Sequence, residues 1–137
     1  MLAIYHKAYG DNHYLVGIAT SNLANTYTDA KQFTVAEPLF RKAVAVFTRA
    51  QGPQSMNTGI ARIKLGRTLL GLHRHRDALA ETLAGYQIVS KQAAPTNRFL
   101  TVARKDLVKE YEAMGEAQKA EPFSKQLASL GETVAHR

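Results

Sequence analysis

The stretch AEPLFRKAV, residues 36–44, decides the fold because its opening returns at the far end of the chain. Residues 120–123 read AEPF, so the alanine, glutamate and proline of positions 36–38 recur at positions 120–122. A step of half this distance divides the chain without gaps into three successive copies, residues 2–43, 44–85 and 86–127. A fixed period of this size is typical of a solenoid, in which each repeat buries its apolar face only against its neighbours.

The three copies place apolar residues of similar character at the same positions. Within each copy they follow the three- and four-residue spacing that gathers side chains on one face of a helix. No stretch alternates between apolar and polar residues as a half-buried strand would, so the copies predict an all-α protein. The recurring positions are Ile4, Val46 and Ile88; Ala19, Ala61 and Ala103; Leu23, Leu65 and Leu107; Tyr27, Leu69 and Tyr111; and Ala36, Ala78 and Ala120.

Each copy is predicted to contain two helices. The first helices are expected over residues 15–29, 57–72 and 98–114, and the second over residues 34–51, 76–93 and 117–129. Residues 2–9 have the pattern of one more second helix, which gives about seven helices in all. Breaks are expected between copies at Gly10, Gly52-Pro53 and Pro95, and within copies near Lys31-Gln32, His73 and Gly115.

Pro38 lies in a segment whose other residues favour a helix. Proline lacks a backbone N–H, so it is tolerated near a helix start, where most N–H groups have no intrahelical partner. Thr34 and Glu37 have the spacing of a capping box. The sequence therefore predicts a helix that begins at Thr34, with Pro38 in its first turn.

The repeat resembles the tetratricopeptide repeat, in which small residues let two antiparallel helices approach and large residues fill the gap between them. That family usually has a period of about 34 residues, and the longer period here, about 42 residues, resembles its kinesin-light-chain type. The middle copy departs from the pattern at Lys64 and at Leu79-Ala80. The residues that carry the resemblance are Gly10, Asn12, His13, Asn22 to Ala24, Tyr27, Ala36 to Phe40 and Ala43.

The resemblance implies a right-handed α-solenoid of antiparallel helix pairs that forms a single array over residues 1–137. Repeats are expected over residues 14–52, 56–93 and 97–130, with the end of an earlier second helix at 2–10 and a tail at 131–137. Because a solenoid cut at such ends leaves apolar residues uncovered, we expect either a longer array or self-association. The residues concerned are Leu2, Ile4, Tyr5, Leu127 and Leu130.

The composition narrows the class of protein. The chain has no cysteine, which excludes a disulfide framework and thiolate metal sites and agrees with a reducing compartment. No apolar run approaches the roughly 20 residues that a membrane-spanning helix needs, so we expect a cytoplasmic protein with no membrane partner. Catalytic carboxylate pairs, a nucleophile with its base and phosphate-binding glycine loops are absent from the sequence, so we expect no enzymatic activity and no cofactor. His73 and His75 lie at a predicted bend, where a structural role is favoured over metal binding.

The net charge of +7 arises in the middle of the chain. Between Ile60 and Lys109 there are ten basic and three acidic residues, whereas the rest of the chain carries eight of each sign. In the family that the chain resembles, the outward face of the first helices lines a concave groove that holds extended peptides. Helical spacing places Asp106 and Glu112 on this face as well. The residues expected to bind a peptide are Ser21, Asn22, Asn25, Ile63, Lys64, Arg67, Leu70, Lys105 and Lys109.

These residues suggest a protein-binding scaffold. The two asparagines could bond a peptide backbone, the cations could pair with carboxylates, and Ile63 and Leu70 could offer apolar surface. The leading hypothesis is therefore a non-catalytic module that binds an extended acidic segment of another protein. One alternative is a nucleic-acid-binding helical repeat, although Tyr27 and Tyr111 occupy core positions and leave no aromatic ladder for bases. Another is a regulatory segment of a larger signalling enzyme.

Overall fold

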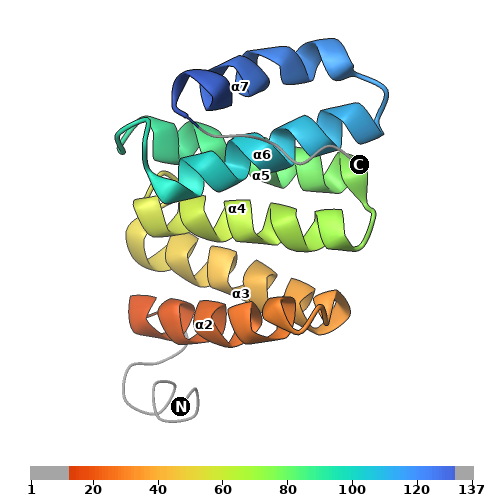
Figure 1. Ribbon diagram of the computed structural model, residues 1–137. Coiled ribbons are helices and arrows are strands. Elements are labelled where there is room, and N and C mark those ends of the chain that lie inside the picture. The colour runs from red at the N-terminus through yellow and green to blue at the C-terminus, as the bar shows by residue number, and fades with distance from the viewer. Residues whose placement is uncertain (1–12, 132–137) are drawn as a thin grey trace.

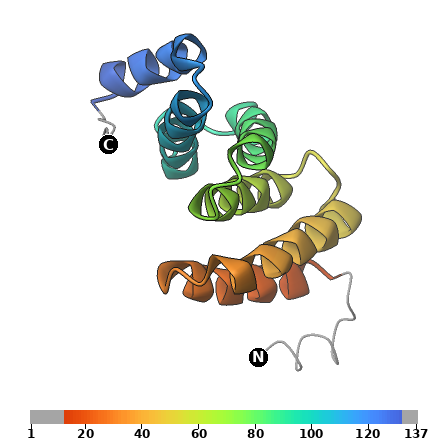
Figure 2. The same ribbon diagram turned by 90° about the vertical axis from the view of Figure 1, so that its right-hand side faces the viewer.

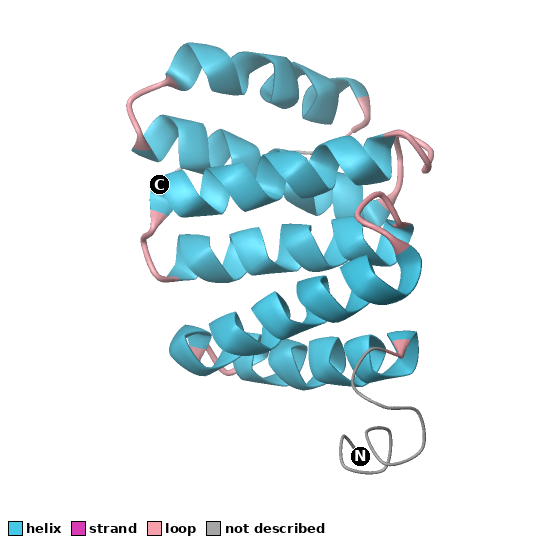
Figure 3. Cartoon of the chain, turned by 180° about the vertical axis from the view of Figure 1, so that it is seen from behind, coloured by secondary structure: helices cyan, strands magenta, loops and turns pink. Residues whose placement is uncertain are grey.

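The computed structural model describes residues 13–131, which form six helices and no strand (Figures 1 and 3). The segment at 2–10, where a seventh helix was predicted, lies outside the described residues, as does the tail after residue 131. None of the helices within 13–131 has the length and apolar character needed to cross a membrane. The helices are α2 (Tyr14–Asp29), α3 (Phe33–Gln51), α4 (Met56–Gly71), α5 (His75–Ser90), α6 (Arg98–Ala113) and α7 (Ala117–Ser129).

The helices stack in chain order into an elongated array. The helices α2 and α3, α4 and α5, and α6 and α7 form three pairs, and α3 packs on α4 as α5 packs on α6. Figure 2 shows the described chain rising from α2 at one end to α7 at the other. Because each element contacts its neighbours in sequence, with α4 also reaching α6, the architecture is the predicted solenoid.

The sequence period reappears in how the helices begin. Each first helix has an N-cap side chain that accepts a hydrogen bond from a backbone N–H: His13 from Leu15, Ser55 from Thr58 and Asn97 from Phe99. Successive caps are separated by one repeat period. The N-cap residues of the second helices make no such side-chain bond. The start of each first helix is therefore fixed by a side-chain N-cap. The start of each second helix is fixed instead by the short turn that connects it to the first.

The predicted start of α3 was wrong. The helix begins at Phe33 after Gln32, so Thr34 lies inside the helix and makes no capping bond. Glu37, the proposed partner of Thr34, instead accepts hydrogen bonds from Arg41 at 3.0 Å and Arg74 at 2.9 Å. Pro38 consequently lies in the second turn of the helix, and Pro122 occupies the equivalent place in α7.

The turns within the three pairs share one backbone conformation. Lys31, His73 and Gly115 have φ values of 59°, 60° and 74°, in the left-handed region, and they are spaced by the repeat period. This confirms the predicted breaks within the copies. A residue of this conformation after a helix lets the backbone turn back and begin the next helix within a few residues. Lysine and histidine adopt it here although glycine does so at lower cost.

Recurring small and large residues supply much of the core, although Ala19 and Leu23 of the first copy are only partly buried. Ala36, Ala78 and Ala120 are buried at equivalent places of the three second helices, as the recurring positions predicted. The helices α4 and α5 approach closely, so a methyl group added to Gly66 or Gly85 would collide with the facing helix. Leu127, expected near solvent, is buried against Val108 and Ala120.

We expect Leu65→Ala to lower the free energy of unfolding by about 2–5 kcal/mol, because Leu65 is 2% exposed and its removal leaves a cavity between α3 and α4. Chemical denaturation followed by circular dichroism measures this change. Val35→Ala, at an exposed position of α3, serves as the control and should have little effect. Equal, small effects of both substitutions would contradict the assigned core.

Candidate functional site

A row of three hollows runs along the first helices, and we call this row the groove. The N-terminal hollow, of about 270 Å³, is lined by Asn22, Ile60, Lys64 and Phe99, among others. The middle hollow, of about 150 Å³, shares Lys64 and Phe99 with it. The C-terminal hollow, of about 820 Å³, lies where α2, α4 and α6 end, and shares Arg67 with the middle hollow. Shared walls thus join the three hollows along the helix axes.

Most of the residues predicted to bind a peptide line this groove. Asn22, Asn25, Lys64, Arg67, Leu70 and Lys109 all contribute to its walls. Ser21 and Ile63 also border it, but they are only 6% and 1% exposed. Ile63 belongs to the core with Val89 and Leu100 and so does not provide the expected apolar surface. Lys105 lies outside the walls of these three hollows.

Three of the ten basic residues counted in the middle of the chain are engaged elsewhere in the fold. Arg62 pairs with Glu81 at 2.8 Å, and Arg74 bridges Glu37 of the preceding pair. Arg104 is buried and donates a hydrogen bond to the carbonyl of Pro95 at 2.8 Å. These three arginines lie outside the walls of the three hollows. Three acidic residues, Asp29, Asp106 and Glu112, lie in the C-terminal hollow together with Lys31, Arg67 and Lys109.

Lys64 is the cation shared by the N-terminal and middle hollows. Its ammonium lies 5.6 Å from the centre of the Phe99 ring, and the guanidinium of Arg98 lies over the same ring at 4.8 Å. Burial, together with repulsion by Arg98, lowers the pKa of Lys64 from its ordinary value. Among the described residues, no acidic side chain forms an ion pair with it. Within residues 13–131, the positive charge of Lys64 is therefore not paired with an acidic side chain.

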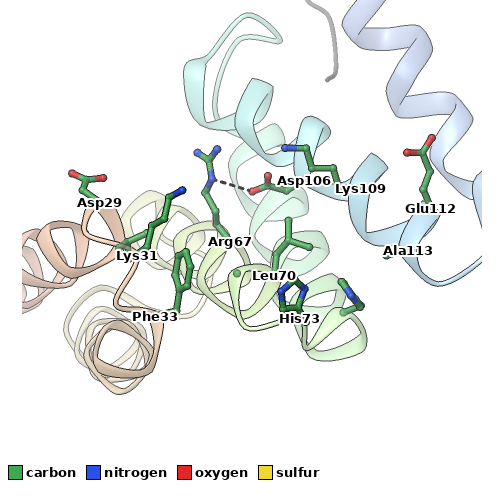
Figure 4. Close-up of a pocket in the computed structure, with 13 residues that line it drawn as sticks. Asp29, Lys31, Phe33, Arg67, Leu70, His73, Asp106, Lys109, Glu112 and Ala113 are labelled. Atoms are coloured by element: carbon green, nitrogen blue, oxygen red, sulfur yellow. Dashed lines mark ion pairs between the residues drawn. The ribbon is translucent and has the colours of Figure 1, made fainter. Parts of the chain in front are cut away.

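Arg67 and Asp106 face each other in the C-terminal hollow (Figure 4). The Nε atom of Arg67 lies 3.9 Å from Oδ2 of Asp106, which is an ion pair without a hydrogen bond. Burial raises the pKa of Asp106 to about 6, against the attraction of Arg67 and Lys109. At neutral pH the carboxyl group of Asp106 is thus mainly ionised.

Glu110 of α6 is an acidic residue buried in the core. Its side chain is 0% exposed and lies between α5 and α6, where Oε2 accepts a hydrogen bond from Thr82 at 2.9 Å. The other carboxyl oxygen, Oε1, is buried without a hydrogen-bond partner. Burial raises the pKa of Glu110 to about 9, and the negative charge of Asp106 adds to the rise while the bond from Thr82 opposes it. Glu110 is therefore a neutral carboxylic acid at neutral pH.

His73, in the turn between α4 and α5, and His75, the first residue of α5, both border the C-terminal hollow. Their rings meet edge to face, with centroids 6.0 Å apart. Across the part of the chain that the structure describes, no group of three metal-binding side chains is placed to hold an ion.

The stacked helix pairs and their period define the class of the protein. The tetratricopeptide repeat family model matches residues 15–81, which cover α2 to the middle of α5. The matched residues are tetratricopeptide repeats, and the array that they begin has the fold of kinesin-light-chain-like repeats. Arrays of this family are scaffolds for protein–protein interaction and are generally not catalytic.

A curated relative aligns with most of the chain. The chain is 31% identical over 132 residues to the clustered mitochondria protein homolog of Debaryomyces hansenii, a match that covers 88% of this chain and 10% of the relative. The chain thus spans about a tenth of the length of that curated relative.

Two solved structures have the same fold. BtubC (BKLC) from P. vanneervenii superposes with a TM-score of 0.81 at 22% identity, over 99% of this chain and 56% of that chain. A putative kinesin light chain with nearly identical TPR-like repeats from Podosopora anserina gives a TM-score of 0.82 at 18% identity, over 98% of this chain and 64% of that chain.

We expect the stability of the protein to depend on the protonation of Glu110. In the unfolded chain this group ionises near its ordinary pKa of 4.5, whereas in the folded chain it keeps its proton up to about pH 9. The stabilisation is complete below the unfolded pKa and is lost as the pH rises through the folded one, with a slope of up to about 1.4 kcal/mol per pH unit.

Glu110→Gln should remove this slope, because the glutamine side chain is neutral at every pH and can still accept the hydrogen bond from Thr82. Unfolding free energies measured from pH 5 to pH 9 test the expectation, with Glu112→Gln on the exposed face of α6 as the control. Parallel curves for the wild type and Glu110→Gln would contradict it.

Proposed function

We propose that the groove binds an extended segment of another protein, and that an acidic side chain of that segment pairs with Lys64. The observation that carries this proposal is that the positive charge of Lys64, between the two smaller hollows, is not paired with an acidic side chain within residues 13–131. An ammonium that is partly withdrawn from water and repelled by a second cation gains from an incoming carboxylate more than an exposed lysine does. The neighbouring Arg98 adds to this attraction.

The walls around Lys64 suit a segment with apolar and polar side chains. Phe99, Ile60 and Phe47 give the N-terminal hollow an apolar lining. Asn22 borders the same hollow and Asn25 the next one, so each offers an amide that can donate to and accept from a peptide backbone. An extended segment can therefore place an apolar side chain in the N-terminal hollow while its neighbouring carboxylate reaches Lys64.

Nucleic-acid binding is less consistent with the groove. The acidic residues Asp29, Asp106 and Glu112 border its largest hollow, where phosphates would be repelled. Tyr27 and Tyr111 pack against core clusters, so their rings are not free to stack on bases. Phe99 alone does not form a ladder. A protein segment is the partner that this surface favours.

Lys64→Glu should weaken binding of acidic peptides about tenfold or more, because it removes a charge-assisted hydrogen bond and adds a repulsive charge. The probe is a set of fluorescently labelled synthetic peptides in which Asp and Glu alternate with Leu and Ser, measured by fluorescence anisotropy. Lys91→Glu makes the same change in net charge at the exposed end of α5, outside the groove, and should bind these peptides as the wild type does.

Two outcomes would contradict the proposal. Equal losses of peptide affinity for Lys64→Glu and Lys91→Glu would show that the net charge of the protein determines binding and that the groove has no specific role. Tighter binding of labelled single-stranded oligonucleotides than of the acidic peptides, with a steep dependence on salt concentration, would favour the nucleic-acid alternative.

A further inference from the structure

Asp106 is an unexpected residue in a groove proposed to bind acidic segments. It is 1% exposed, it borders the largest hollow, and it is mainly ionised at neutral pH. Its Oδ2 atom accepts no hydrogen bond from any described residue. A site that bound acidic segments through charge complementarity alone would have no carboxylate at this position, because the carboxylate of Asp106 repels those of the partner.

The geometry of Arg67 suggests what this carboxylate does. Arg67 extends from α4 into the hollow with its side chain 54% exposed, and its Nε atom is the one that lies 3.9 Å from Asp106. Figure 4 shows the two terminal nitrogens of Arg67 beyond Nε, on the side away from Asp106. The terminal fork, which can bind a carboxylate through two parallel hydrogen bonds, thus lies beyond Nε from Asp106 on a side chain that is more than half exposed.

We propose that Asp106 is a positioning residue that holds Arg67 across the groove, so that its terminal nitrogens bind a carboxylate of the partner segment. This inference rests on the proposed function of the groove. A free arginine side chain loses considerable rotamer freedom when it binds, and an arginine held in place beforehand avoids part of this loss. Asp106 can restrain the side chain of Arg67 because its own side chain is buried in α6 and therefore fixed in position.

For Asp106→Asn, the inference predicts a change in peptide affinity opposite to the one that charge alone predicts. Asp106→Asn removes a negative charge from a site for acidic peptides, so charge alone predicts tighter binding. If Asp106→Asn instead frees the side chain of Arg67 to move, binding should weaken, by about threefold to tenfold for a coupled pair of this kind. Glu112→Gln removes a negative charge from the same hollow without altering Asp106, so it should tighten binding.

The experiment measures the affinity of the labelled Asp- and Glu-containing peptides for the wild type, Asp106→Asn and Glu112→Gln, together with the unfolding midpoint of each. The same measurement in an Arg67→Gln background should show no weakening by Asp106→Asn, because the group that Asp106 positions is gone. A merely structural role of Asp106 would lower the midpoint and weaken binding in both backgrounds, and that result would overturn the inference.

Arg67→Lys provides a second test that does not disturb a buried residue. It keeps the charge of the hollow but removes Nε and the fork, so binding should weaken. The same exchange at an exposed position of α5 outside the groove, Arg76→Lys, is the control and should cause no loss. Tighter binding by Asp106→Asn, or unchanged binding by Arg67→Lys, would overturn the positioning role and leave the proposed function standing. Failure of the wild type to bind any acidic peptide would overturn the proposed function, and this inference with it.

Discussion

The close contact of small residues within each helix pair is the constraint on which the rest of the structure depends. Alanine at position 36 and its two equivalents, with Gly66 and Gly85 in the middle pair, let the backbones approach until larger side chains fill the space around them. A wider spacing would open cavities beside Phe40 and Leu65. It would also separate the first helices, whose outward faces form the groove. The groove therefore exists because the pairs behind it are tight.

The fold could be predicted from the sequence because it repeats. Packing positions that recur in all three copies gave helix bounds within about one residue for five of the six described helices, and only α5 ends three residues earlier than expected. The errors are local. The capping role of Thr34 was inferred from spacing alone, which does not reveal that Arg74, from the next helix pair, competes for Glu37.

The site could be predicted only in part, because helical spacing shows which face a residue lies on but not how deep its side chain is buried. Lys64 and Arg67 lie on the expected walls, whereas Ile63 turns into the core. The burial of Glu110 could have been suspected from a comparison of equivalent positions in the three copies. Thr82 stands where the first copy has Phe40, and the smaller side chain leaves room that Glu110, in a column otherwise occupied by threonine, fills from the next helix.

That exchange of an aromatic ring for a threonine and a buried acid also affects how the array comes apart. In a linear stack, cooperativity is only as strong as the contact between successive units, since no distant element holds both sides together. The contact of α5 with α6 contains a carboxyl oxygen that lacks a hydrogen-bond partner, whereas the contact of α3 with α4 contains the ring of Phe40. Partial opening should therefore begin between α5 and α6, with α6 and α7 separating as one unit and α2 to α5 remaining folded.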